Sequence, residues 1–238
     1  NRVLEIDDVV RLPVASSEAV LSNEERELGV CLIDIGCGTT DIAIFTDGTI
    51  KHTAVIPIGS QMVTKDIRII LCTSLDAAEE IKIQYGCVSS NSDMDVKIPV
   101  PSVSDKPDTE TTKTILSQII AARVNEIFDA IQKEIVNSGY SSKIRAGLVF
   151  TGGGVKLEGL DNFAESYFQK PSRIGSPKSI KGLEDLRGKT RYSTAVGLLL
   201  YRHRELNLMS SKNKYTSKIG SMFDRYAKKL SDYFQKEL

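Results

Sequence analysis

The sequence lacks several features that would narrow its function at once. It has no net charge, with 31 basic and 31 acidic side chains among 238 residues. It has no apolar run of about 20 residues that could span a bilayer, and no signal peptide is recognised. Four cysteines show no paired spacing of the kind that binds zinc: Cys31, Cys37, Cys72 and Cys87. We therefore expect a globular, cytosolic chain without structural disulfides and without nucleic acid as a partner.

The composition divides the chain into a body and a C-terminal tail that starts at Lys212. Hydrophobic residues make up 41% of the chain, enough for the core of one large domain or of two ordinary ones. From Lys212 to the end, seven basic residues stand against three acidic ones, so a basic tail follows a mildly acidic body. The sequence starts at Asn1 without a methionine, and we expect it to be a piece of a longer protein.

The stretch from Leu32 to Phe45 is the most informative part of the sequence. Two apolar runs flank a turn rich in glycine and threonine, which predicts two buried strands joined by a tight loop. Glycines let the backbone approach an anion, and successive N–H groups and threonine hydroxyls can bind phosphate oxygens. An aspartate at each end could hold Mg²⁺ or fix the loop. The alternative is an ordinary hairpin turn. The residues concerned are Asp34, Gly36, Cys37, Gly38, Thr39, Thr40 and Asp41.

Short helices and strands are predicted around this loop. Asp47-Gly48 favours a tight hairpin turn, and Ser74 favours the start of a helix. The predicted elements are a strand at 3–10, a helix at 13–21, a charged connector at 22–27, a strand at 50–57, a helix opened by Gly59 and Ser60 with Val63, Ile67, Ile70 and Leu71 on one face, and a helix at 75–85.

The second half of the chain contains a second glycine turn. A buried strand at 146–150 leads directly into Thr151-Gly152-Gly153-Gly154, which either places backbone N–H groups beside a ligand or makes a tight turn into a helix. The other predicted elements are a polar excursion at 88–113 with one strand at 96–100, a helix at 114–136 with Ile115, Ile119, Ala122, Ile127, Ile131 and Ile135 on its apolar face, a short helix from Leu157, an edge strand at 173–175, a loop at 178–189 and a closely packed helix at 192–201.

The tail has the pattern of an amphipathic helix. Apolar residues recur at steps of three and four, with lysine and arginine between them, which is typical of a helix lying in a membrane interface. The alternative is a helix that docks on a protein surface. The apolar positions are Ile219, Met222, Phe223, Tyr226, Leu230, Tyr233 and Phe234. The position at the end of the chain, after a polar linker, favours the membrane.

Several short motifs together resemble a known family. They are Pro13-Val14-Ala15-Ser16-Ser17, Asp34 to Asp41, Ala78-Glu79-Glu80-Ile81-Lys82, Val100-Pro101-Ser102-Val103, Thr151-Gly152-Gly153, Glu158-Gly159-Leu160, Arg173-Ile174-Gly175 and Tyr192 to Leu198. In this order they resemble the bacterial cell-division protein family FtsA, within the actin/Hsp70/sugar-kinase ATPase superfamily. The resemblance implies an α/β fold: an actin-like (ribonuclease H-like) ATPase lobe with a second α/β subdomain inserted and most of the first lobe missing.

The resemblance implies a site for ATP and Mg²⁺. By family pattern, Gly36, Gly38 and Thr39 would hold the β- and γ-phosphates, and Asp34 would hold Mg²⁺ through water. Glu79 and Lys82 would reach the ribose and adenine, although by themselves they would be a solvated surface pair. Gly152 and Gly153 would lie against the nucleoside. The whole expected set is Asp34, Gly36, Cys37, Gly38, Thr39, Thr40, Asp41, Glu79, Lys82, Gly152, Gly153 and Gly154.

Two positions depart from the superfamily pattern. Cys37 stands where the family usually has a third glycine, and actin carries a side chain there, so we expect binding to survive. Leu12 stands where actin and Hsp70 have a glutamine or glutamate that orients the attacking water. Leucine cannot do this, and we expect at most a slow ATPase that uses ATP as a conformational ligand.

The resemblance also implies partners and a location. We expect an adaptor that self-associates like actin and ties FtsZ to anionic lipids on the cytoplasmic face of the inner membrane at the division site, with the FtsZ C-terminal peptide near Arg123 and Glu126. The alternative is a small-molecule kinase or another actin-fold ATPase. The expected segments are a connector at 1–28, the nucleotide-binding subdomain at 29–87 and 146–190, the inserted FtsZ-binding subdomain at 88–145, a returning helix at 191–207, a linker at 208–217 and the membrane helix at 218–238.

Overall fold

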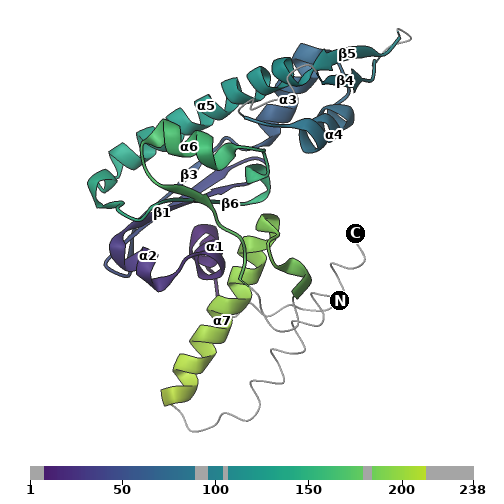
Figure 1. Cartoon of the computed structure of the whole chain (residues 1–238). Helices are drawn as coiled ribbons and strands as arrows, with labels where there is room; N and C mark the ends of the chain where they lie inside the picture. The colour runs from purple at the N-terminus through teal and green to yellow at the C-terminus, as the bar shows by residue number, and fades with distance from the viewer. Residues whose placement is uncertain (1–7, 89–95, 104–106, 179–183, 213–238) are drawn as a thin grey trace, which may run out of the picture.

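One five-stranded sheet organises the chain. The computed structural model describes residues 8–88, 96–103, 107–178 and 184–212. The sheet has the order β3-β2-β1-β6-β7, in which β1, β2 and β3 form an antiparallel meander and β6 and β7 run parallel to β1 (Figure 1). The strands are β1 Val30–Ile35, β2 Thr40–Thr46, β3 Thr49–Ile56, β6 Gly147–Thr151 and β7 Ser172–Ile174. The predicted α/β fold and the predicted meander are confirmed.

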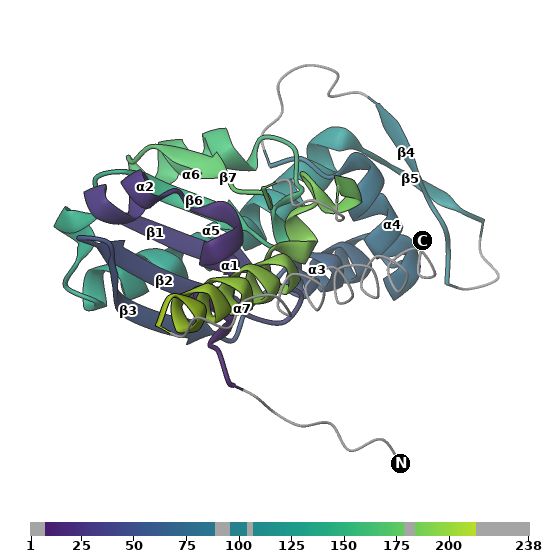
Figure 2. The ribbon, with the colours of Figure 1, turned by 90° about the horizontal axis from the view of Figure 1, so that it is seen from below.

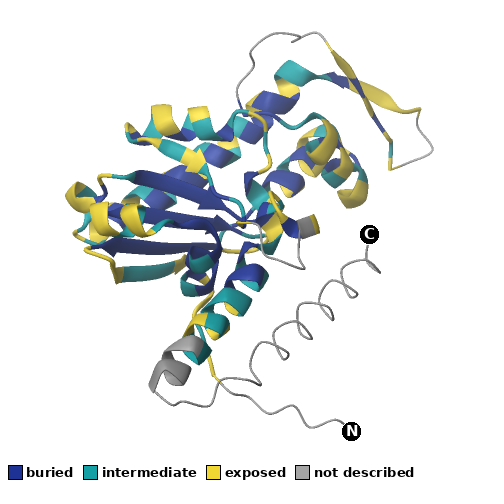
Figure 3. Ribbon diagram, turned by 60° about the horizontal axis from the view of Figure 1, so that its bottom comes forward, coloured by how far each residue is buried: buried dark blue, intermediate teal, exposed yellow. Residues whose placement is uncertain are grey.

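Helices cover both faces of this sheet. Alternate residues of β1 point to opposite sides, so Ile33 packs with α5 (Lys113–Asn137) and α6 (Leu160–Phe168), whereas Leu32 lies in a second core beside α1 (Leu12–Val20) and α7 (Ser193–Lys212). Figure 3 shows the central strands as a buried layer between these helices, whereas the edge strand β3 is exposed or half-buried. Because both faces are covered, β1 and β2 are buried along their whole length.

A smaller unit extends from one end of the long helix α5. It contains α3 (Gln61–Leu71), α4 (Leu75–Tyr85) and a two-stranded sheet of β4 (Lys97–Val100) and β5 (Thr109–Thr112), beside the sheet in Figure 2. The excursion was predicted to hold one strand, but β5 pairs with β4. Its sequence Thr-Glu-Thr-Thr has no apolar alternation that could have predicted it.

The predicted apolar faces of two helices need correction. In α5, Ile115 and Ala122 are exposed, while the buried stripe includes Leu116, Ile120, Val124 and Phe128 as well as Ile119, Ile127, Ile131 and Ile135. In α3, Val63 and Ile67 are buried, but Ile70 is 56% exposed. The smaller unit covers only one side of each helix, so some apolar side chains remain outside the core.

The segment predicted as a charged connector is a short helix, α2 (Asn23–Leu28). The Ser22 side chain accepts from the Glu25 N–H at 3.1 Å, and the Glu25 carboxylate accepts from the Ser22 N–H at 2.8 Å. This capping box satisfies two backbone N–H groups at the helix start and stabilises a helix that has no buried residue. The prediction overlooked the serine-to-glutamate spacing.

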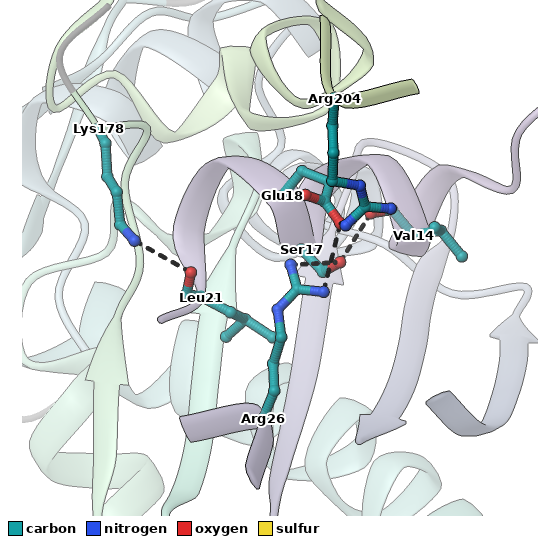
Figure 4. A network of polar contacts seen from close by, with 7 residues as sticks. All are labelled: Val14, Ser17, Glu18, Leu21, Arg26, Lys178 and Arg204. Carbon is teal, nitrogen blue, oxygen red and sulfur yellow. Dashed lines mark hydrogen bonds and ion pairs between the residues drawn. The ribbon is translucent and has the colours of Figure 1, made fainter. Parts of the chain in front are cut away.

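Helices α1 and α7 are in close contact. A Cβ atom at Gly197 would lie 1.8 Å from the Ala15 carbonyl oxygen, so the two backbones touch where α7 has no side chain. Figure 4 shows Glu18 of α1 between Arg26 of α2, at 3.3 Å, and Arg204 of α7, at 2.8 Å. The close packing predicted for the helix at 192–201 is confirmed at Gly197.

Other predicted boundaries differ from the observed ones. Helix α7 continues past residue 201 to Lys212, into the segment expected to be a linker. Helix α6 begins at Leu160, after a short 3-10 turn at Gly153–Val155. Residues 8–10 are not in a strand. The rest of the strand predicted at 3–10 and the helix predicted at 218–238 lie outside the described residues.

Candidate nucleotide site

The loop between β1 and β2 has the form of an anion cradle. The Gly36 N–H donates to the Thr39 carbonyl at 2.9 Å and closes the turn, while the carbonyls of Gly36 and Cys37 accept from the first backbone N–H groups of the α3 region, each at 2.9 Å. Within the described chain, the N–H groups of Cys37, Gly38 and Thr39 have no backbone acceptor. A Cβ at Gly38 would meet no atom within 4 Å. The loop therefore offers consecutive free donors and open space to an anion.

Two carboxylates lie opposite each other at the base of this loop. Asp34 of β1 pairs in register with Asp41 of β2, and they are 9% and 8% exposed. Asp34 Oδ2 accepts hydrogen bonds from Ser16 Oγ of α1 at 2.5 Å and from Thr194 Oγ1 of α7 at 3.2 Å. Asp41 Oδ2 accepts one from Thr39 Oγ1 at 3.3 Å. Both helices that cover the second face of the sheet thus meet at Asp34.

The electrostatics of this pair suit a cation. Burial raises the pKa of Asp34, and the hydroxyls of Ser16 and Thr194 only partly oppose this shift. Burial and the neighbouring charge of Asp34 raise the pKa of Asp41. A divalent cation would relieve the repulsion between two ionised carboxylates. The described residues contain no group of three or more His, Cys, Asp or Glu side chains at metal-binding distance. Mg²⁺ fits such a pair, because it keeps several waters and takes phosphate oxygens as further ligands.

The second glycine turn lies directly against the first loop. Gly152 has a φ of +98°, and a Cβ there would lie 2.4 Å from Asp34 Oδ1 and 2.4 Å from the Ile35 carbonyl oxygen. A Cβ at Gly154 would lie 2.7 Å from a methyl carbon of Ile35. Only glycine permits this approach of β6 to the end of β1. Gly153 has no such restriction and lines the adjoining cavity.

A cavity of about 710 Å³ extends from these loops to α3 and α4. Its polar wall contains Thr64 of α3 with Glu79 and Lys82 of α4. Lys82 Nζ donates to Glu79 Oε2 at 2.7 Å and to Thr64 Oγ1 at 2.9 Å, and Thr64 Oγ1 donates to Glu79 Oε2 at 2.5 Å. Burial alone would raise the pKa of Glu79, but the hydrogen bonds from Lys82 and Thr64 hold it below its ordinary value. Glu79 and Lys82, for which the alternative was a solvated surface pair, are therefore hydrogen-bonded to each other in the cavity wall.

The structure separates the twelve expected residues into three sets. Five of them line the cavity: Cys37, Glu79, Lys82, Gly153 and Gly154. Asp34, Gly36, Gly38, Thr39, Asp41 and Gly152 form the loops at its side. Thr40 is fully buried and its hydroxyl donates to the Ile58 carbonyl at 2.8 Å, so this side chain supports the loop.

Sequence reasoning missed several residues of the site. Ser16 and Thr194 lie within quoted motifs but were given no role, although they hold Asp34. Thr64 lies in a helix without a motif, and only the fold brings it to Glu79. Lys156 and Arg191, which also line the cavity, gave no local signal.

The residues expected to contact a partner peptide are engaged within the chain. Arg123 of α5 makes a two-pronged ion pair with Asp66 of α3, at 2.5 and 2.9 Å, and also contacts Glu126 at 2.5 Å. Glu126 is exposed and Arg123 is not. Arg123 therefore ties α5 to α3, and only Glu126 is open to solvent.

The sheet order and the helices on both of its faces define an actin-like fold. MreB5 of Spiroplasma citri, in a crystal structure with ADP, matches with a TM-score of 0.69 and 19% identity over 84% of this chain and 61% of that chain. The PilM–PilN type IV pilus biogenesis complex matches with a TM-score of 0.57 and 17% identity over 80% of this chain and 51% of that one.

Sequence relatives identify the family. The family described as "Cell division protein FtsA" matches residues 31–197. The cell division protein FtsA of Pseudomonas aeruginosa is 49% identical over 199 residues, covering 83% of this chain and 48% of the relative. That of Escherichia coli K12 is 38% identical over 244 residues, covering 98% and 57%. This chain belongs to the FtsA family, and it spans about half the length of these curated relatives. Among the described residues, no helix is long and apolar enough to cross a membrane.

Proposed function

We propose that this chain is the nucleotide-binding and membrane-tethering part of an FtsA-type division adaptor. It binds ATP with Mg²⁺, self-associates in an actin-like manner and ties FtsZ to the inner membrane. The observation that carries the proposal is the meeting of two glycine turns, two buried carboxylates and a polar cavity at one edge of the sheet. Actin-like neighbours crystallised with ADP and AMPPNP support nucleotide as the ligand.

Each part of the site suits one part of ATP. The free N–H groups at Cys37, Gly38 and Thr39 suit phosphate oxygens. Asp34 would hold Mg²⁺ through water, with Asp41 beside it. The wall with Glu79 and Lys82 suits the ribose and base, and Gly152 to Gly154 would pass beside the nucleoside. Bound Mg²⁺ supplies positive charge that neutralises the phosphates.

Hydrolysis is expected to be slow. Leu12, at the start of α1, is 52% exposed and carries no group that could orient a water. Nucleotide then acts by changing the relative stability of conformations. Asp34 contacts Ser16 of α1 and Thr194 of α7, and through these hydrogen bonds the presence of nucleotide at Asp34 would affect both helices.

The remaining functions lie at the surface and in the tail. The apolar positions from Ile219 to Phe234 lie outside the described residues, and their pattern supports an interfacial helix on anionic lipid at the cytoplasmic face of the inner membrane. Each basic residue near such a surface contributes about 1 kcal/mol, so one tail binds weakly and many tails on a polymer bind stably. Exposed Glu126, on the helix held by Arg123, is the proposed contact for the FtsZ C-terminal peptide.

The nucleotide part of the proposal is tested by calorimetry and turnover assays. We expect weak binding of Mg·ATP, because a chain of about half the relatives' length would supply only part of the pocket. Phosphate release should be slow and should not increase with added sugars or small acids. Tight binding would contradict the expected weakness, and rapid turnover with a small acceptor would favour a kinase instead.

A further inference from the structure

Thr64 links the two charged residues of the cavity wall. Thr64 is 2% exposed, whereas the side chain of Glu79, which lines the cavity, is 44% exposed. Its hydroxyl accepts from Lys82 at 2.9 Å and donates to Glu79 at 2.5 Å. A hydroxyl can do both at once, which no apolar side chain of the same shape can. Thr64 therefore fixes Glu79 from the side of α3.

The two oxygens of Glu79 have different environments. Oε2 accepts from both Lys82 and Thr64. Oε1 accepts no hydrogen bond from any residue that the structure describes, and it belongs to a side chain that lines the cavity. An ionised carboxylate only accepts hydrogen bonds, so its free oxygen selects a ligand with hydroxyl donors and repels phosphate.

We propose that Thr64 is a positioning residue that orients Glu79 toward the ribose hydroxyls of the bound nucleotide and thereby makes the site prefer ribonucleotides to dideoxynucleotides. This inference rests on the nucleotide site proposed above. With Oε2 held on two sides, Oε1 points in one direction, and a hydroxyl placed there gains a charge-assisted hydrogen bond. A sugar without hydroxyls offers no donor to Oε1 and so loses this hydrogen bond.

The test compares Mg·ATP with Mg·2′,3′-dideoxy-ATP on the 238-residue chain. Dissociation constants come from the rise of the unfolding temperature over a titration to millimolar nucleotide, which measures weak binding. We expect the wild type to bind ATP roughly tenfold more tightly than the dideoxy analogue. Thr64→Val, which keeps the shape and removes the hydroxyl, should lower this ratio to about twofold or less, and Thr64→Ser should retain it.

Each outcome bears on a different claim. Equal discrimination in Thr64→Val and wild type overturns the role of Thr64. Equal affinity of the wild type for both nucleotides overturns ribose recognition but leaves the nucleotide site intact. No stabilisation of the wild type by either nucleotide overturns the inference together with the proposed function. If Thr64→Val does not fold, Thr64→Ala replaces it, with Thr64→Ser again as the variant that keeps the hydroxyl.

Discussion

At Asp34, the charge that a cation site needs is also one that lowers the stability of the fold. Asp34 is a buried carboxylate beside a second one, and its pKa is raised by burial. A folded-state pKa above the unfolded value means that the folded protein binds the proton more tightly than the unfolded chain does. Stability contributed by this group is therefore greatest at acid pH and falls as pH rises through its folded pKa. At neutral pH the buried charge of Asp34 therefore lowers the stability of the folded protein. Functional sites retain such residues, and a cation site would need this charge.

Asp34→Asn should separate these two effects of the charge. Removing the charge while keeping the shape and the contacts with Ser16 and Thr194 should leave the free energy of unfolding unchanged or higher at pH 7.5. The variant should lose its advantage over wild type as pH falls to about 4, near the ordinary aspartate pKa. It should also lose the Mg²⁺-dependent part of nucleotide binding. Urea unfolding at both pH values measures the first effect, and clear destabilisation at pH 7.5 would contradict it.

At Gly38, a substitution should change nucleotide affinity without changing the stability of the fold. A Cβ there meets no atom within 4 Å, so Gly38→Ala should change the free energy of unfolding by less than about 0.5 kcal/mol. The new methyl group would occupy space beside the free N–H groups. We expect nucleotide affinity to fall by roughly tenfold, because the phosphate must move away from its donors. Unchanged affinity in titrations of the unfolding temperature would argue against phosphate at this loop.

At the scale of elements, α1 and α7 form one packed unit. Gly197 lies against the Ala15 carbonyl, and the ion pair between Glu18 and Arg204 joins the same two helices. Both helices also donate a hydroxyl to Asp34. A shift of one helix against the other would therefore disturb Asp34, and the site would be coupled to helix packing.

Gly197→Ala should show how close this packing is. In an exposed helix, replacing glycine by alanine stabilises by about 0.5–1 kcal/mol. Here the added carbon would lie 1.8 Å from backbone, so we expect destabilisation of about 1–3 kcal/mol in urea unfolding. Gly38→Ala is the matched control. A stabilising effect of Gly197→Ala would mean that the helices are farther apart in solution.

Elements were predictable where the signal was local. The apolar runs at β1, β2 and β6 and the hairpin at Asp47-Gly48 specify their own structure, and these predictions are confirmed. Strand β5 was not predictable, because it is stabilised by pairing with β4 and its own residues give no strand pattern. Likewise the two glycine turns were each recognised, but their contact, in which Gly152 lies against Asp34, depends on the parallel pairing of β1 and β6.

In the whole molecule, helix α7 connects the proposed nucleotide site in sequence to the C-terminal tail. Helix α7 leads from the Asp34 contact at Thr194 to Lys212, and the basic, aromatic segment follows it in sequence. We propose that this segment brings the chain, and FtsZ with it, to anionic lipid. A soluble enzyme of the same fold would have no need of such a segment.

Co-sedimentation with anionic liposomes shows whether the tail tethers the chain to a membrane. The full chain is compared with a chain ended after Ser217, each alone and with FtsZ. We predict that the full chain pellets with liposomes and carries FtsZ with it, that added salt weakens the effect because lipid charge contributes, and that the shortened chain stays in the supernatant. If both chains stay in the supernatant, or if both pellet equally, the tail is not the membrane tether and the adaptor account is contradicted.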